Sequence, residues 1–239
     1  MKLRVIFLSV FAGISLMVIA QGKFEIHGGM SVPSFEFRQT DTQYGGAAET
    51  GVNFGVKYIF SPATKGLSFT LGADCLLNGL NQDGKSSMES MMKNTLTTSL
   101  QPYTYSNFSI NHLSYVNIPV FAGVEYKLPV DKLTSLYLNG GLGPNYSKVS
   151  DMSVGFNFQG YDAKMTESFE SKIGFAYQLG IGLLFQNQYS VHFGYNALGL
   201  NKYKNTTTFK MNGQSQSQDN TSTLDVRIST FSATFGIRF

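Results

Sequence analysis

The chain has 239 residues, which allows one or two domains. Only 14 % of its residues are charged, whereas soluble domains usually carry about 25 %. Apart from two basic residues near the N-terminus, sixteen Lys and Arg stand against fifteen Asp and Glu, so the net charge is near +1. This balance excludes a basic nucleic-acid-binding protein. Cys75 is the single cysteine of the sequence, which excludes an intramolecular disulfide framework.

Residues 1–20 have the pattern of a secretory signal peptide. A start with two basic residues precedes an uncharged apolar run at residues 5–19. We expect cleavage before Gln21, which leaves residues 21–239 as one mature domain. The alternative is a membrane anchor, but a spanning helix needs about 20 apolar residues and this run is shorter. The sequence therefore predicts an exported protein.

Apolar and polar residues alternate in eight runs along the mature chain, and this period of two predicts β-strands. The polar positions of the runs hold mostly Gly, Asn, Ser and Thr rather than charged residues. The runs are residues 24–32, 52–60, 67–77, 116–126, 136–146, 173–185, 191–197 and 231–239.

The connections between these runs alternate in length. The short ones are residues 61–66, 128–134 and 186–188, and the long polar ones are about 39–48, 79–107, 148–170 and 203–222. An even number of strands with alternately short and long connections is typical of outer-membrane barrels. We predict an all-β fold, namely an eight-stranded antiparallel up-and-down transmembrane β-barrel with short periplasmic turns and long extracellular loops. Both chain ends are then periplasmic, and the expected location is the outer membrane of a Gram-negative bacterium.

The alternation fits two kinds of barrel. A soluble lipocalin-like barrel turns its apolar set inward and its polar set to water, so the polar set should be rich in Lys and Glu. Here the polar set is small and almost uncharged, and aromatic residues such as Tyr58, Tyr126 and Phe185 lie near strand ends. This pattern favours an apolar set that faces outer-membrane lipid, with aromatic girdles, around a lumen filled by side chains.

The last run, residues 231–239, ends on Phe239. Its nine residues are close to the ~9–11 that a tilted membrane strand needs. A terminal aromatic residue on such a strand resembles the assembly signal that the barrel-insertion machinery of bacteria reads. Leu224, Val226 and Ile228 precede this run in the opposite phase, so we expect a bulge or a change of environment near residues 229–230.

Several stretches resemble the PorT-like outer-membrane β-barrel family of Bacteroidetes. Tyr115, Ile118 and Pro119 match a Tyr-x-x-Ile-Pro strand, and residues 193–200 match a late aromatic-Gly-Tyr-Asn strand that leads to Gly-Leu. The resemblance covers the whole mature chain. It implies a barrel in the outer membrane, and for some members a part in a protein secretion system.

Polar residues that should face the lumen gather near the predicted periplasmic end. They are Glu25, His27, Lys57, Glu125, His192 and Arg238. A closed barrel makes the first and last strands neighbours, so Glu25 and Arg238 should be able to pair. One interpretation is a gate or a proton-linked site. The favoured interpretation is a plug of paired charges, because an eight-stranded barrel has just enough interior for side chains.

The long connections suggest a role at the cell surface. Residues 152–165 and 206–228 continue to alternate, with a turn signal at Asn212-Gly213, so we expect hairpins beyond the bilayer with edges open to a protein partner. A protective surface without a partner is the alternative. Met88 and its two neighbouring methionines favour an amphipathic segment over a copper site, which would need convergent thioethers.

The predicted function is a non-enzymatic membrane scaffold that displays its loops for binding or adhesion, with a part in a secretion assembly as an option. A small-solute channel is the second hypothesis. An outer-membrane hydrolase or acyltransferase is the third, with His112 near Ser109 and Ser114 as its best candidate. No catalytic residue, cofactor or metal is predicted.

Overall fold

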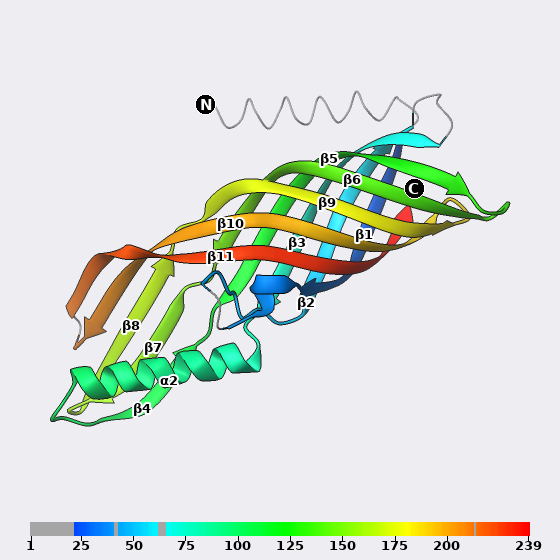
Figure 1. Cartoon of the computed structure of the whole chain (residues 1–239). Coiled ribbons are helices and arrows are strands. Elements are labelled where there is room, and N and C mark those ends of the chain that lie inside the picture. Colours follow the sequence, from blue (N-terminus) through cyan, green and yellow to red (C-terminus); the bar gives the residue numbers. More distant parts are fainter. Residues whose placement is uncertain (1–21, 41–42, 62–65, 213) are drawn as a thin grey trace.

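The computed structural model describes residues 22–40, 43–61, 66–212 and 214–239, with residues 220–222 as backbone alone. The predicted signal peptide, residues 1–20, lies outside this part. Within it the chain forms eleven strands, an α-helix and a 3-10 helix (Figure 1). The helices are η1 (Phe35–Arg38, the 3-10 helix) and α2 (Gln82–Ser99). The strands are β1 (Gly22–Pro33), β2 (Gly51–Phe60), β3 (Leu67–Gly79), β4 (Tyr105–Asn111), β5 (Ser114–Pro129), β6 (Thr134–Val149), β7 (Met152–Phe158), β8 (Tyr161–Phe169), β9 (Lys172–Phe185), β10 (Tyr189–Met211) and β11 (Gln214–Arg238).

Eight strands pair in a closed antiparallel ring. Its order is β1, β2, β3, β5, β6, β9, β10 and β11, and β11 pairs again with β1. The eight alternating runs of the sequence all lie in these ring strands. The total nevertheless differs from the predicted eight, because β4, β7 and β8 are additional strands outside the ring.

The additional strands form a second sheet with the far ends of the two longest ring strands. Its order is β11, β10, β8, β7 and β4, and we call it, together with α2, the distal sheet. Figure 1 shows α2, β4, β7 and β8 together at one end of the barrel. The prediction of long loops is therefore wrong for residues 79–107 and 148–170, most of which are helix or strand. The hairpin predicted within residues 206–228 is confirmed, because β10 and β11 pair there up to Met211 and Gln214.

Local chemistry explains why two of these segments are ordered. Asn81 caps α2, because its side chain accepts a hydrogen bond from the Gly84 N–H at 2.8 Å. The β7–β8 hairpin turns at Gln159 and Gly160, which both have positive φ angles, of 50° and 82°. The predicted continuation of the ring strands is thus replaced between β6 and β9 by a separate hairpin.

The short connections lie at the opposite end of the barrel, with both ends of the described chain. In the β5–β6 turn, Asp131 accepts hydrogen bonds from the N–H groups of Leu133 and Thr134, both at 2.7 Å. These bonds hold the pKa of the Asp131 carboxyl below its usual value. Phe239 is paired with Phe24 through backbone hydrogen bonds of 2.8 and 3.2 Å, which close the ring at this end.

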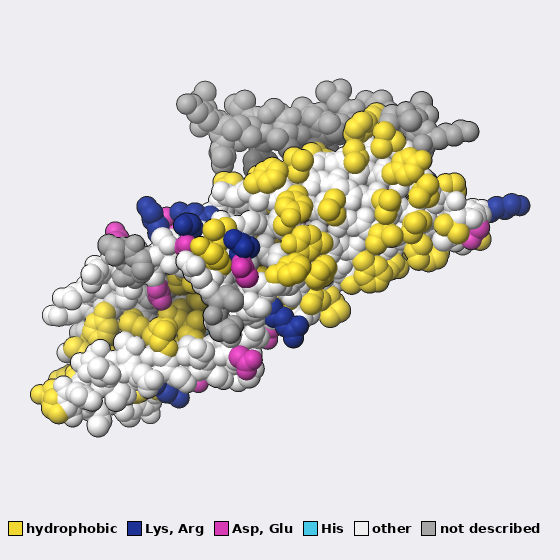
Figure 2. All heavy atoms as spheres, in the orientation of Figure 1, with side chains coloured by type: hydrophobic (Ala, Val, Ile, Leu, Met, Phe, Trp, Pro, Cys, Tyr) yellow, Lys and Arg dark blue, Asp and Glu magenta, His cyan; other side chains and the backbone are white. Residues whose placement is uncertain are grey.

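The outward face of the ring is apolar and its interior is largely polar. On β11, for example, Phe231 and Phe235 are exposed, whereas Thr230, Ser232 and Thr234 are buried. Figure 2 shows the hydrophobic side chains gathered over the barrel strands. No helix in the part of the chain that the structure describes is long and apolar enough to span a membrane.

In the part of β11 that precedes Thr230, apolar residues face inward and polar residues face outward, the reverse of the pattern after Thr230. Val226 and Ile228 point inward and are buried, while Arg227 between them is exposed. Every second residue of β11 faces inward on both sides of this point, from Val226 to Thr234, so the strand contains no bulge there. What changes near residues 229–230 is the kind of side chain that faces inward, as the expected change of environment requires. The irregularity lies in the partner strand, where the register shifts between Ala197 and Gly199 of β10.

Candidate functional site

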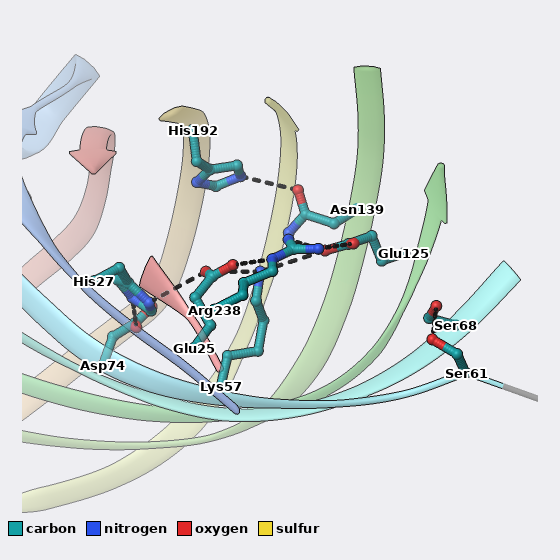
Figure 3. A network of polar contacts seen from close by, with 10 residues as sticks. All are labelled: Glu25, His27, Lys57, Ser61, Ser68, Asp74, Glu125, Asn139, His192 and Arg238. Atoms are coloured by element: carbon teal, nitrogen blue, oxygen red, sulfur yellow. Dashed lines mark hydrogen bonds and ion pairs between the residues drawn. The ribbon is translucent and has the colours of Figure 1, made fainter. Parts of the chain in front are cut away.

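The structure brings together the four charged residues predicted to face the lumen (Figure 3). Arg238 of β11 donates to both oxygens of Glu125 on β5, at 2.8 and 2.9 Å, and its Nε donates to Glu25 of β1 at 2.5 Å. Lys57 of β2 lies with Nζ 3.2 Å from Glu25 and 3.4 Å from Glu125. All four residues are buried. Each carboxylate therefore contacts both cations, which is the pairing that buried charges require.

Strand register explains half of this cluster. Glu25 lies directly opposite Arg238 on one side of β1 and directly opposite Lys57 on the other. Cross-strand neighbours of opposite charge on one face of a sheet attract each other. Glu125 approaches from the far wall of the barrel, so the long Arg238 side chain spans the lumen between non-adjacent strands.

The two predicted histidines lie in the same part of the lumen, and each has its own polar partner. Nε2 of His27 is 2.7 Å from Asp74 Oδ1 on β3, and Nε2 of His192 is 2.9 Å from Asn139 Oδ1 on β6. The second contact crosses over β9 at Gly180, where any Cβ atom would collide with the His192 ring. Asp74 and Asn139 were not predicted as members of the network, although both stand at inward positions of their runs.

Sequence reasoning also missed the aromatic centre of the cluster, Tyr137. Its ring is fully buried, 5.9 Å from the His192 ring and nearly parallel to it. Nζ of Lys57 lies 5.5 Å and the Arg238 guanidinium carbon 4.9 Å from the centre of the Tyr137 ring. Both cations are thus held by carboxylates and by an aromatic face.

The lumen beside the cluster keeps a cavity of about 30 Å³. Its lining includes His27, Asn53, Asp74 and His192. Nδ1 of His27 and Oδ1 of Asn53 have no hydrogen-bond partner among the described residues. A cavity of this size accommodates about one or two water molecules and no larger solute.

An apolar layer fills the lumen toward the distal sheet. Phe37 of η1 is fully buried and packs edge-on against Tyr115 of β5, with ring centres 5.1 Å apart. The Tyr115 hydroxyl donates to the Gly46 carbonyl at 2.7 Å, which fixes the segment between β1 and β2 over this end. Leu76 and Leu198 are buried in the same core. Side chains therefore close the lumen at two levels, one charged and one apolar.

The distal sheet has two faces of opposite character. Its inner face carries an apolar row, and α2 adds Met92 and Leu96 to the same core cluster. The outer face carries a row of hydroxyl and amide side chains that crosses all five strands. Strand register aligns the inner row as Ile110, Val154, Met165 and Phe209, and the outer row as Asn111, Ser153, Thr166, Thr208 and Ser217.

Residues 6–239 match the family model described as outer membrane protein beta-barrel domain. The chain belongs to this family of outer-membrane β-barrels. The membership agrees with the closed ring and its apolar outward face, and it places the protein in the outer membrane.

Solved structures similar to this outer-membrane barrel come from several bacteria. Neisserial surface protein A (NspA) shares 10 % identity over 91 % of this chain and 95 % of its own, with a TM-score of 0.45. A major outer membrane protein from Thermus thermophilus shares 12 % identity over 92 % and 100 %, with a TM-score of 0.46. Ail of Yersinia pestis shares 13 % over 91 % and 97 %, with a TM-score of 0.40. No curated protein matches the chain.

Two further predicted features of this outer-membrane barrel have clear positions. His112 is paired with Glu89 of α2, with Nε2 3.3 Å from Oε1, and not with either predicted serine. The Ser109 hydroxyl contacts the Gly155 carbonyl instead. The methionines of α2 do not converge, because Met92 is buried in the core and Met91 is exposed. This geometry supplies neither a serine nucleophile with its base nor a set of thioether ligands.

Proposed function

We propose that this protein is a non-enzymatic outer-membrane scaffold whose distal sheet faces the outside of the cell and binds a macromolecular partner there. The observation that carries the proposal is the outer face of the distal sheet. Its row of hydroxyl and amide groups runs across five strands and is partly or fully exposed. Such groups both donate and accept hydrogen bonds, so the face suits a polar partner. The external position follows from the usual arrangement of these barrels, whose longer segments are extracellular.

The filled lumen supports a scaffold rather than a channel. The charged cluster around Arg238 and the apolar layer around Phe37 fill the lumen at two levels, and the cavity beside the charged cluster measures about 30 Å³. We infer that the barrel anchors and orients the distal sheet and that the charged cluster is a structural plug. Measured in planar bilayers, the purified protein should give no single-channel current above background. A reproducible conductance would favour the small-solute channel instead.

The binding role is testable with a photo-cross-linking amino acid at Thr166, in the middle of the outer face. We expect it to capture a specific partner on intact cells, whereas the same group at Lys132, in an exposed turn at the opposite end, should not. The captured partner is then purified and titrated against the detergent-solubilised protein. Thr166→Arg together with Thr208→Arg should weaken this binding at least about tenfold, since bulky charges replace hydroxyls at the contact. Unchanged binding in that double variant would argue for a protective surface without a partner.

We also propose a role for residues 1–20 in export, a part in secretion, and the absence of a catalytic role for His112. Residues 1–20 direct export, so N-terminal sequencing of the membrane-inserted protein should begin at Gln21. From the PorT-like resemblance we propose a part in a protein secretion assembly of Bacteroidetes. Deletion of the gene should then reduce protein secretion by the cell, and normal secretion would argue against this role. His112→Ala should leave lipid-modifying and proteolytic activities of the membrane unchanged, because its partner is Glu89 and not a nucleophile.

A further inference from the structure

A groove of about 580 Å³ lies on the outside of the barrel, lined by residues of η1, β9, β10 and β11. This volume falls within the ~300–1,000 Å³ typical of ligand sites. The groove lies at the edge of the lipid-facing surface, next to the distal sheet. Residues that line it include Phe35, Glu36, Tyr177, Tyr195, Leu200 and Arg227.

The side of the groove toward the membrane centre is aromatic. Tyr177 and Tyr195 stand on the outward faces of neighbouring strands with ring centres 6.3 Å apart. Phe35 extends over them from η1, 6.1 Å from the Tyr195 ring and 6.3 Å from the Phe231 ring. It is 66 % exposed and has a φ angle of 49°. A left-handed backbone is unusual for a bulky residue, so the fold holds this phenylalanine at the groove against its local preference.

The side toward the distal sheet carries one guanidinium. Arg227 is the single basic residue among the described residues that line the groove. Its backbone N–H donates to the Tyr44 carbonyl at 3.1 Å, and its guanidinium lies 5.3 Å from the Tyr44 ring centre. Nη1 is 3.0 Å from Glu36 Oε2, so the guanidinium forms an ion pair with this carboxylate. The Arg227 side chain is nevertheless 52 % exposed, and a guanidinium has five N–H donors, so donors remain for a second anion.

We propose that this groove is a binding site for a membrane lipid with an anionic phosphate headgroup, in the leaflet next to the distal sheet. The acyl chain lies against Tyr177, Tyr195 and Phe35, continuous with the lipid-facing surface. The phosphate accepts hydrogen bonds from Arg227, the geometry in which guanidinium recognises phosphate well. Aromatic side chains with a basic residue above them match the order of chain and headgroup across a membrane interface.

A tryptophan reporter tests the site directly, because the chain contains no tryptophan. Tyr195→Trp places a single indole, the groove indole, in the site. Phe193→Trp supplies the reference indole, on the same outward face of β10 but outside the groove lining. The full mature chain is placed in phosphatidylcholine vesicles that contain a minor fraction of phosphatidylglycerol with brominated acyl chains, and quenching is measured. We expect about five-fold enrichment of the anionic lipid at the groove indole relative to the reference indole, the factor expected for one basic side chain at the surface.

Three variants in the Tyr195→Trp background separate the contributions of the groove. Arg227→Gln should remove the enrichment, and Lys202→Gln, an exposed basic residue of the same face outside the groove lining, should keep it. Glu36→Gln should raise it, because a competing carboxylate beside Arg227 is neutralised. Unfolding curves confirm that each variant is folded, and Tyr177→Trp serves as a second reporter if Tyr195→Trp does not fold.

Several results would overturn the proposal. Equal quenching of the groove indole and the reference indole, or enrichment that survives Arg227→Gln, would show no specific headgroup site. Brominated phosphatidylcholine that quenches the groove indole as strongly as brominated phosphatidylglycerol would show an acyl-chain contact without selectivity for the anionic headgroup. Recovery of fluorescence on addition of inorganic phosphate would assign Arg227 to a soluble anion instead of a lipid.

Discussion

The barrel and the distal sheet share strands β10 and β11, yet they have opposite patterns of apolar side chains. In the barrel part of β11, Phe231 and Phe235 face outward while Ser232 and Thr234 face the lumen. In the distal part of the same strand, Val226 and Ile228 face inward and Arg227 faces outward. Because the strand is continuous, the backbone does not cause the difference. We infer that the surroundings do, because the outward face of a membrane barrel meets lipid, whereas the proposed external position of the distal sheet exposes it to water.

This reversal fits the different roles that we propose for the two regions. The barrel buries its charges in a closed cluster and exposes apolar side chains to lipid, which suits an anchor. The distal sheet carries an apolar row on the face toward α2, where Val154 is fully buried and Phe209 remains 36 % exposed. It carries a hydroxyl row on the other face. Figure 2 shows the same division on one side of the molecule, with hydrophobic side chains spread over the barrel and polar ones over most of the distal end. The boundary between the regions contains the proposed lipid groove.

The largest effect should come from breaking the charged cluster of the barrel. We expect Arg238→Ala to lower the free energy of unfolding by about 3–5 kcal/mol, because Glu25 and Glu125 keep their buried charges and then share the Lys57 ammonium. Urea-induced unfolding of the purified protein in vesicles measures this change. Lys132→Ala, in the exposed β5–β6 turn, is the control and should change stability by no more than about 0.5 kcal/mol. Similar losses in both variants would contradict a structural role for the cluster.

The same substitution at two outward positions of β10 tests the lipid boundary. Phe193→Lys places a charge on the lipid-facing surface of the barrel and should cost about 2–4 kcal/mol. Thr208→Lys adds a charge to the water-facing row of the distal sheet and should cost less than about 0.5 kcal/mol. The unfolding free energies in vesicles give both values. Comparable costs would mean that the two outward faces meet the same solvent.

A reciprocal pair of near-isosteric changes on β11 tests the inward faces. Val226→Thr buries a hydroxyl group in the apolar core of the distal part and should cost about 1–3 kcal/mol. Thr230→Val removes an acceptor of the Asn196 amide, which retains Ser232 as another acceptor at 3.4 Å, so about 0.5–1.5 kcal/mol is expected. Equal stability of the wild type and Val226→Thr would show that this interior admits water.

The ring could be predicted from the sequence because eight runs alternate with a period of two and short connections join successive runs in pairs. It also placed Glu25 against Arg238, since closure makes the first and last strands neighbours. Tyr137 escaped prediction because Leu136 and Leu138 flank it, and three apolar residues in a row hide which one faces inward. The contact of Arg238 with Glu125 depends on the distance across the lumen, which no local pattern contains.

The distal sheet was harder to predict than the ring. Its hairpin alternates, but the alternation of residues 152–165 fits a continued ring strand as well as a separate pair. The helix α2 has a mostly polar sequence, and its apolar residues Met88, Met92 and Leu96 are too few to stand out, although their spacing of four is helical. Tertiary packing onto the apolar row of the sheet supplies the stability that the isolated segment lacks.

The smallest effect should appear in the cap of α2, and it should stay within the distal region. Asn81→Ala removes the side-chain acceptor of the Gly84 N–H and the contact of its amide with the Arg38 carbonyl at 3.1 Å. We expect about 1 kcal/mol of local destabilisation, the usual cost of a lost N-cap. Amide hydrogen exchange should accelerate about five-fold in the first turns of α2 and remain unchanged in the ring strands.

Asn81→Asp is the matched control, because a carboxylate preserves the acceptor and suits a helix N-terminus. It should restore the exchange rates of α2 in part, because the carboxylate keeps the acceptor for the Gly84 N–H but cannot donate to the Arg38 carbonyl. Faster exchange throughout β5 and β6 in Asn81→Ala would show that the barrel and the distal sheet unfold as one unit. The barrel and the distal sheet would then form a single cooperative unit in spite of their opposite side-chain patterns. An effect confined to α2 would instead show that the barrel is stable independently of the distal sheet.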